Sequence, residues 1–229
     1  MTSKHALKAI ALAGLMTAAT AHAAGYDATA DFQTLSNPGG VWSYGYSPSG
    51  GAGYALTLFD ANGSIGTGWV MSGYSTLNTP AAFINLDAPV AGVATGQFAL
   101  HPGPAAFGDL AILRFTAPAA GDYTVTGQFF AGDSGSMQGL IIANDDAVHP
   151  LQTFADTTDA SIFAPLTITL AAGAHLDFAV GNNGNFLYGS TPVSVQISAV
   201  PEPGSYLLML AGLGLMACVS SRRKTRSDA

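Results

Sequence analysis

The chain has 229 residues, of which 48% are hydrophobic and only 9% charged, with 28 glycines and 12 prolines. This composition is too apolar for a disordered polymer and too rich in helix breakers for a helical bundle. The single cysteine excludes a disulfide framework and a cysteine-based zinc site, and the formal net charge of −7 argues against binding to nucleic acid.

The first 23 residues have the three-part pattern of a secretory signal peptide. Lys4 and Lys8 precede an uncharged run over residues 9–19, and Ala21 and Ala23 flank one variable position. As a helix the run would be about 16 Å long, too short for a bilayer core of about 30 Å. We therefore expect export and cleavage after Ala23. The alternative is an amphipathic helix buried in the fold.

The next 177 residues, 24–200, form the predicted body of the protein. They contain twelve aspartates, no glutamate, no lysine and one arginine, Arg114, which is a formal net charge of −11. Glutamate and lysine are the best charged helix formers, and their place is taken by residues that suit strands and turns. The composition predicts an all-β body.

Alternating apolar and polar residues predict a series of short strands separated by glycine, proline and asparagine turns. Residues 110–115 are almost continuously apolar, which predicts a central strand. Nine or ten strands in one domain indicate a jelly-roll-like antiparallel β-sandwich. In chain order the main predicted strands cover residues 41–46, 54–59, 67–71, 82–86, 97–100, 110–115, 123–126, 166–170, 176–180 and 193–198.

Three segments of the body carry a resemblance to known surface proteins. Residues 115–125, FTAPAAGDYTV, resemble a hairpin common in bacterial surface β-sandwiches, many of them carbohydrate-binding-like. Residues 37–46 and 176–185 resemble segments of exported jelly-roll proteins that carry a C-terminal sorting tail. The resemblance covers most of the body and implies a fold, which does not by itself fix a function.

Two patterns raise the question of hydrolysis. Residues 132–135, Gly-Asp-Ser-Gly, match the nucleophile motif of chymotrypsin-like proteases, but such a Ser134 would need a histidine base from His101, His149 or His175. A glycosidase needs two facing carboxylates, whereas Asp145 and Asp146 are adjacent and would point to opposite faces of a strand. A hairpin loop and solvated carboxylates explain both patterns, and we expect no enzymatic activity.

Calcium is the one cofactor for which the body offers ligands. Calcium binds several oxygen ligands, and Asp133, Asp145 and Asp146 are candidates to provide them. No EF-hand or repeat spacing accompanies them. The alternative is that the acidity keeps a secreted protein soluble.

Aromatic residues offer a candidate sugar-binding surface. Trp42, Tyr44 and Tyr46 alternate, so on a strand all three rings lie on one face, where they could stack on sugar rings. The alternative is that these rings belong to the hydrophobic core.

The last 29 residues, 201–229, have three parts. Pro201, Glu202 and Pro203 begin the segment, residues 205–221 are uncharged, and a basic tail covers 222–229. As a helix the uncharged stretch would be about 26 Å long, a marginal membrane span. The basic residues after it would hold the C-terminus in the cytoplasm, and they are Arg222, Arg223, Lys224 and Arg226.

This order of proline motif, apolar helix and arginine cluster resembles the bacterial PEP-CTERM sorting signal. The resemblance implies a Gram-negative source that makes exopolysaccharide, and an exosortase in the inner membrane that cuts the tail near the PEP motif. The sequence thus predicts a non-enzymatic protein that the secretion machinery exports, that is transiently anchored in the inner membrane, and that reaches the cell surface or matrix, where it could bind exopolysaccharide. The alternatives are a surface hydrolase and a permanently anchored single-pass envelope protein.

Overall fold

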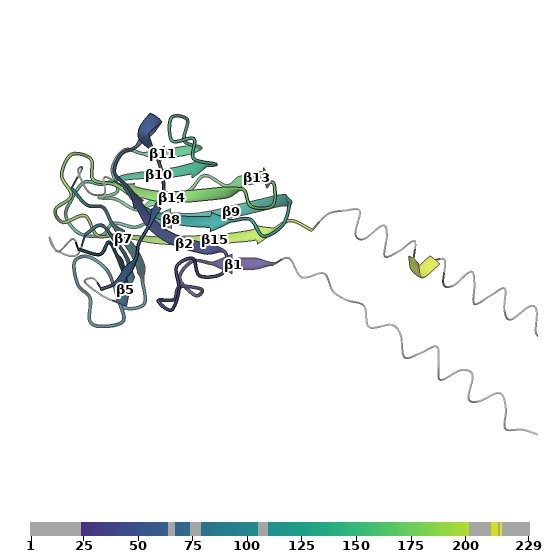
Figure 1. The fold of residues 1–229 in the computed structure, drawn as a ribbon, viewed down its shortest axis with the longest axis horizontal. Helices are drawn as coiled ribbons and strands as arrows, with labels where there is room; N and C mark the ends of the chain where they lie inside the picture. Colours follow the sequence, from purple (N-terminus) through teal and green to yellow (C-terminus); the bar gives the residue numbers. More distant parts are fainter. Residues whose placement is uncertain are drawn as a thin grey trace, which may run out of the picture. The chain divides into compact units, whose positions relative to one another are not determined.

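Strand residues with alternating apolar side chains build two antiparallel sheets that face each other (Figure 1). The computed structural model describes residues 24–63, 67–73, 79–104, 110–201, 212–214 and 216. Within Ala24–Val200, a single compact unit, the described residues contain one 3-10 turn, η2 (Gly51–Gly53). The described strands are β1 (Gly25–Asp27), β2 (Trp42–Ser47), β3 (Thr57–Leu58), β4 (Ala61–Asn62), β5 (Thr67–Val70), β6 (Ala81–Ile84), β7 (Phe98–His101), β8 (Leu110–Thr116), β9 (Gly121–Phe129), β10 (Gln138–Ala143), β11 (Gln152–Phe154), β12 (Ser161–Ile162), β13 (Leu166–Leu170), β14 (His175–Gly181) and β15 (Thr191–Ala199).

The prediction of an all-β antiparallel sandwich is confirmed. One sheet has the order β11-β10-β14-β8-β2-β3, so β8 is a central strand, as its apolar run predicted. The other sheet has nine strands in the order β12-β9-β15-β7-β6-β5-β4, with β1 beside β15 and β13 beside β9. Two ladders have seven register pairs each: β9 pairs with β15 from Val193↔Phe129 to Ala199↔Tyr123, and β8 pairs with β14 from His175↔Thr116 to Gly181↔Leu110.

The main hydrophobic core lies between the sheets. In β8 the residues Ala111, Leu113 and Phe115 point inward and are fully buried, while Ile112 and Arg114 alternate with them on the outer face. Large buried side chains of both sheets complete this core, among them Trp42, Tyr44, Phe98, Leu100, Val125, Phe129, Phe178, Val195 and Ile197.

A second apolar cluster covers the outer face of the six-stranded sheet. Leu110, Ile112, Leu140 and Ile142 alternate with the core residues of β8 and β10. Two loops, residues 48–56 and 144–151, cover them with the side chains of Tyr54 and Ala147. Strands β8 and β10 are therefore buried on both faces.

The two ends of the sandwich are formed by different loops. At the exit end, where β15 finishes, the turns 117–120 and 171–174 join β8 to β9 and β13 to β14. At the far end, where β15 begins, lie the loops 130–137, 155–160 and 182–190. Residues 1–23 and most of 205–221 lie outside the described residues, so the predicted signal helix and transmembrane helix stay predictions. Residues 212–214 and 216 are helical, and within the described residues no helix is long and apolar enough to span a membrane.

Candidate functional site

The most concentrated group of charged side chains lies on the outer face of the six-stranded sheet, near the exit end. Arg114 of β8 and Asp177 of β14 are register partners on adjacent strands. The Arg114 guanidinium donates two hydrogen bonds to the Asp177 carboxylate, from Nε to Oδ1 at 2.7 Å and from Nη2 to Oδ2 at 2.7 Å. Asp177 has no exposed surface, so the only arginine of the body neutralises the most deeply buried carboxylate among the described residues.

Tyr54 covers this pair from the loop 48–56. Its hydroxyl donates a hydrogen bond of 2.5 Å to Oδ2 of Asp177. Burial and the neighbouring Asp177 carboxylate raise the pKa of Tyr54 far above its ordinary value, so the phenol stays protonated and remains a donor. Asp177 thus accepts hydrogen bonds from Arg114 at both oxygens and from Tyr54 at Oδ2, which satisfies a carboxylate that water does not reach.

Asp145 and His175 extend the group toward solvent. Arg114 also donates to Oδ1 of Asp145, and Nε2 of His175 lies 3.1 Å from the same oxygen. Burial raises the pKa of Asp145, but the hydrogen bond and charge of Arg114, together with His175, outweigh it and lower the pKa below its ordinary value. Asp145 is therefore ionised at neutral pH, which is the opposite of what a general acid requires.

A metal ion would fit this group poorly. One ligand atom each of Asp145, His175 and Asp177 lies within 4.8 Å of the others. However, the Arg114 guanidinium already binds both carboxylates, and a cation would have to displace this resident positive charge. The group has the ligand atoms of a metal site, but its negative charges are already compensated by Arg114.

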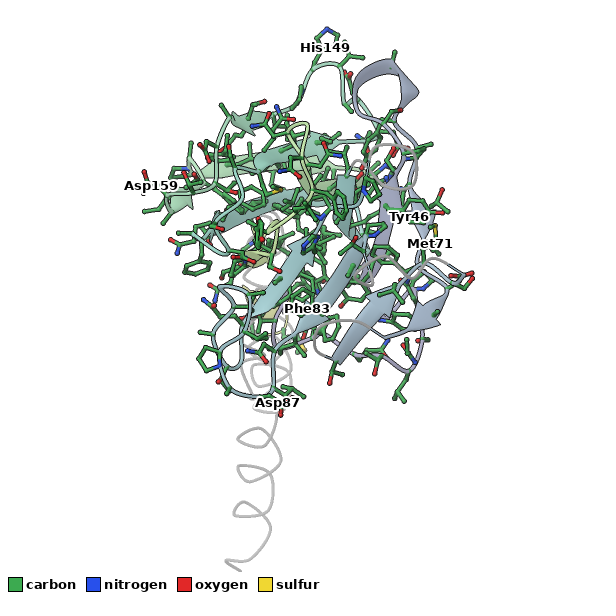
Figure 2. The ribbon with its side chains drawn as sticks, turned by 90° about the vertical axis from the view of Figure 1, so that its left-hand side faces the viewer. Tyr46, Met71, Phe83, Asp87, His149 and Asp159 are labelled. Atoms are coloured by element: carbon green, nitrogen blue, oxygen red, sulfur yellow. The ribbon has the colours of Figure 1, made fainter. Side chains whose placement is uncertain are left out.

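The three aspartates predicted as calcium ligands do not come together. Asp133 precedes β10 and Asp145 follows it, so they lie at opposite ends of a strand about 20 Å long. Asp146 contacts His149 at 3.2 Å in an exposed pair, and Figure 2 shows His149 on a projecting loop. A single site made of Asp133, Asp145 and Asp146 is therefore wrong, and calcium binding elsewhere stays a prediction.

The protease-like tetrapeptide forms a loop of the far end. Ser134 is exposed, and its backbone N–H donates to Oδ1 of Asp133 at 2.8 Å. His101 is buried, with Nδ1 2.6 Å from the carbonyl oxygen of Pro102. Among the described residues no hydrogen bond joins Ser134 to a histidine. Residues 132–135 form a loop, as expected, but the expected hairpin is wrong, because β9 and β10 belong to different sheets.

The aromatic platform predicted at residues 42–46 is wrong for two of its three rings. Trp42 and Tyr44 are 1% and 0% exposed because this face of β2 points toward the nine-stranded sheet. Tyr46 is half-buried and stacks on Phe59, with ring centroids 5.7 Å apart. Alternation placed the three rings on one face, as expected, but that face is the core.

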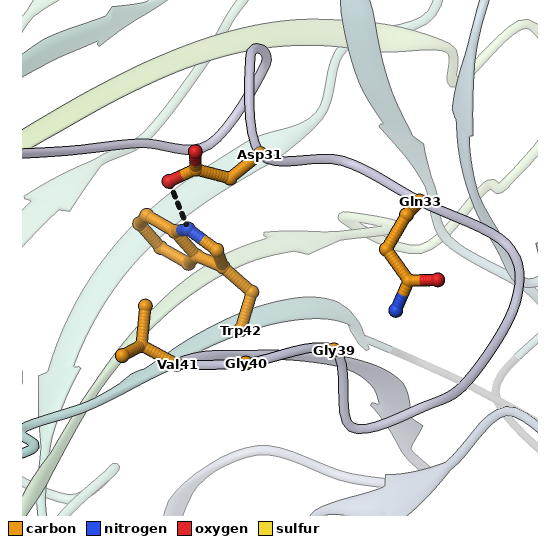
Figure 3. Close-up of a pocket in the computed structure, with 6 residues that line it drawn as sticks. All are labelled: Asp31, Gln33, Gly39, Gly40, Val41 and Trp42. Carbon is orange, nitrogen blue, oxygen red and sulfur yellow. Dashed lines mark hydrogen bonds between the residues drawn. The ribbon is translucent and has the colours of Figure 1, made fainter.

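A half-open pocket of about 350 Å³ lies beside the edge of Trp42 (Figure 3). Trp42 donates from Nε1 to Oδ2 of Asp31 at 3.1 Å. Gln33 uses its amide on its own loop, donating to the Ser36 carbonyl at 2.6 Å and accepting from the Leu35 N–H at 2.6 Å. These polar groups already bond to other groups of the protein and hold the loop between β1 and β2 in place. The pocket therefore has few free hydrogen-bonding groups for a ligand. Asp31, Gln33, Gly39, Gly40, Val41 and Trp42 line it.

Sequence reasoning did not find the group around Arg114. Two signals for it were present, the single arginine in an apolar strand and the aspartate within Leu176-Asp177-Phe178. Sequence alone could not show that these strands are neighbours. Of the predicted processing and topology residues, only Pro201 lies within the described part, and the others lie outside it: Ala21, Ala23, Glu202, Pro203, Arg222, Arg223, Lys224 and Arg226.

Comparison with known families identifies the C-terminal segment. Residues 199–224 match the PEP-CTERM protein-sorting motif, so the chain carries this motif, as the resemblance predicted. No curated protein matches the chain.

Among solved structures, the similarities are weak. A family 35 carbohydrate binding module from Clostridium thermocellum is 17% identical over 40% of this chain and 72% of its own, with a TM-score of 0.28. A family 35 module from an environmental isolate is 15% identical over 70% and 98%, with a TM-score of 0.29. Pika GITRL is 16% identical over 40% and 79%, with a TM-score of 0.29. Similarities this weak identify neither a ligand nor an activity.

Proposed function

We propose that this protein is an exported, non-enzymatic cell-surface or extracellular-matrix protein that an exosortase sorts and processes through its C-terminal tail. The observation that carries the proposal is the place of the sorting motif. It begins at Ala199, the last residue of β15, and its Pro201 follows directly after the sandwich. The proposed route runs through the secretion machinery and the inner membrane.

The sandwich is complete without the tail, which supports removal of the tail after folding. The backbone N–H of Ala199 donates to the carbonyl of Ala24 at 2.9 Å, and that of Val200 donates to the carbonyl of Asp122 at 2.7 Å. All three buried clusters of the described residues consist of residues between Ala28 and Ile197. Cleavage at the proline motif would therefore leave these three clusters whole.

The rest of the proposal concerns what the jelly-roll-like body does outside the cell. The buried carboxylate Asp177 is held by Arg114, and Asp145 has a lowered pKa, so this pair lacks the proton donor of a glycosidase. A polysaccharide-binding role in the exopolysaccharide matrix is favoured over hydrolysis. The body's net charge of −11 also makes nucleic acid an unfavourable partner.

Mass spectrometry of the C-terminus tests the sorting proposal. We expect the wild-type protein to lose its tail near Pro201 in a strain with its exosortase, and to keep it in membranes when the exosortase gene is deleted. Glu202→Ala should slow the loss of the tail. Pro118→Ala, in an exposed turn of the sandwich, is the matched control and should be processed normally.

The same fractions distinguish the alternatives. An intact tail in the membranes of both strains would overturn exosortase processing and establish a permanently anchored protein. Release of sugars from the host's own polysaccharide by the purified protein would instead support a surface hydrolase.

A further inference from the structure

The far end of the sandwich exposes an aromatic ring. Tyr188, in the loop 182–190, is 63% exposed, whereas every other described tryptophan, tyrosine and phenylalanine is buried or half-buried. Its neighbour Leu187 is also exposed. In a body that otherwise buries its rings, an exposed tyrosine is available for contact with another molecule.

The backbone holds this ring in place at an energetic cost. Tyr188 has a φ of +59°, a left-handed conformation that costs a bulky residue roughly 1–2 kcal/mol. Its carbonyl accepts a hydrogen bond of 2.8 Å from the N–H of Gly135, which ties the loop to 130–137. On the other side, Oδ1 of Asn185 accepts a hydrogen bond of 3.1 Å from the N–H of Leu187. These hydrogen bonds fix the backbone that carries the ring, on one side through loop 130–137 and on the other within the loop itself.

Small exposed polar side chains belong to the two loops that meet at Tyr188. Ser134 and Ser136 flank Gly135, whose N–H bonds to the Tyr188 carbonyl, and Asn183 and Asn185 precede Tyr188 in its own loop. Nδ2 of Asn183 makes only long contacts of 3.4 Å with Ser136 and 3.5 Å with the carbonyl of Ala155. Hydroxyl and amide groups next to an aromatic face are the groups that recognise sugar hydroxyls.

The negative charge of the far-end loops favours uncharged polysaccharides over anionic ones. Asp133 lies in loop 130–137, and Asp156 and Asp159 are exposed in the adjoining loop 155–160. The body has no lysine, and its one arginine, Arg114, is paired on the outer face of the six-stranded sheet, near the exit end. An anionic chain would meet carboxylates here without any arginine or lysine to bind it, whereas an uncharged chain meets no such repulsion.

We propose that the far end binds a neutral polysaccharide, with the Tyr188 ring stacked on a sugar and the flanking asparagine and serine side chains bonded to its hydroxyls. This inference deepens the polysaccharide role in the proposed function and rests on it. The proposed sugar-binding surface is therefore the loop 182–190, and not strand β2, where the rings are buried.

Affinity electrophoresis of the full-length protein in detergent tests this inference. The neutral probes are dextran, laminarin and galactomannan, and the anionic probes are alginate and polygalacturonate. We expect at least one neutral probe, and no anionic probe, to retard the wild-type protein. Tyr188→Ala should weaken binding roughly tenfold through loss of the stacked ring, whereas Tyr188→Phe keeps the ring and should bind nearly normally.

A matched control tests whether loss of any exposed apolar side chain, and not only of the Tyr188 ring, weakens binding. Leu35→Ala removes a side chain that is 95% exposed in the loop between β1 and β2 and should leave binding unchanged. Unchanged melting temperatures would show that all variants are folded.

The possible results separate the site from the function. Equal binding by wild type and Tyr188→Ala overturns the Tyr188 site but leaves the polysaccharide role. Retardation by the anionic probes alone overturns the proposed charge selection. Binding to none of the probes overturns the polysaccharide role along with the site, whereas exosortase sorting is tested separately by the C-terminal mass.

Discussion

The exit end and the far end of the sandwich are built in contrasting ways. At the exit end, two alanine-rich turns bond to each other through the backbone, with N–H of Ala117 donating to the carbonyl of Ala174 and N–H of Gly173 donating to that of Ala117, both at 2.8 Å. At the far end, the loops are also linked by backbone hydrogen bonds, as between Asp133 and Ser190 at 2.9 Å, but they carry exposed aspartate, asparagine, serine and tyrosine side chains. The exit-end turns close the fold, and the far-end loops present chemical groups to solvent.

Under the proposed function, one β-sandwich places the attachment point and the binding surface at its two opposite ends. Strand β15 connects the two ends, since it begins beside the loop 182–190 and finishes where the sorting motif starts. We expect changes beyond Val200 to affect processing, changes at Tyr188 to affect binding, and changes to buried or tightly packed groups at either end to affect stability. The following predictions compare the stability of the two ends.

The largest expected effect comes from Arg114→Met, near the exit end. The change leaves Asp177 buried without its cation, and removal of one partner of a buried ion pair costs about 3–5 kcal/mol. Urea unfolding of the purified protein measures the loss. The double variant Arg114→Met, Asp177→Leu should recover much of it, because no uncompensated charge remains. A single variant as stable as the wild type would contradict the role of the pair.

A matched pair of glycine substitutions compares the two ends directly. In Gly132→Ala, at the far end, the added Cβ would lie 1.9 Å from the backbone oxygen of Ser190, so the loops must separate, at a cost of about 1–3 kcal/mol. In Gly25→Ala, at the exit end, the added Cβ meets nothing within 4 Å. Thermal melting should show a drop only for Gly132→Ala. Similar melting temperatures for both variants would show that the far-end loops are loosely packed.

The smallest expected effect is a pH dependence from His101, on the far-end side of β7. Burial lowers the pKa of His101, and this outweighs the opposing effects of the Pro102 carbonyl and Asp133. Below pH of about 6.5 the unfolded chain binds a proton that the folded chain does not, so the free energy of unfolding falls as the pH falls. For one proton the slope is at most about 1.4 kcal/mol per pH unit.

His101→Gln should remove this part of the slope. Urea unfolding at several values of pH between 7 and 5 measures it for both proteins. Parallel stability curves for wild type and variant would exclude His101 as the source.

Much of the fold could be predicted because hydrophobic alternation survives wherever one face of a strand is buried. The predicted strand 166–170 matches β13 residue for residue, and 193–198 lies within β15. Strand β10 was not predicted, although Leu140 and Ile142 lie under Tyr54 and Ile141 faces the core, as in the doubly buried β8. Burial on both faces replaces alternation by a continuous apolar run, the signal that predicted β8 and was missed in β10. The two- and three-residue strands are too short to produce a pattern.

The candidate sites were harder to predict because they depend on distances between strands and on which face is covered. Periodicity correctly grouped Trp42, Tyr44 and Tyr46, but it could not show that their shared face is the interior. Tyr188 follows Asn185 in a loop whose polar residues predict only a turn. Its exposure and left-handed backbone arise from contacts with residues about fifty positions away, such as Gly135.

The position of β15 between the two ends has a mechanical consequence. If the far end grips a polysaccharide while the chain is still tethered beyond Val200, tension runs lengthwise through β15. The grip at loop 182–190 and the tether beyond Val200 lie at the two ends of this one strand, so the covalent backbone of β15 carries the load. Its hydrogen bonds to β9, from Val193↔Phe129 to Ala199↔Tyr123, lie across that direction and need not break, because an extended strand can lengthen little further. The arrangement suits a protein that resists shear between a cell and its surroundings.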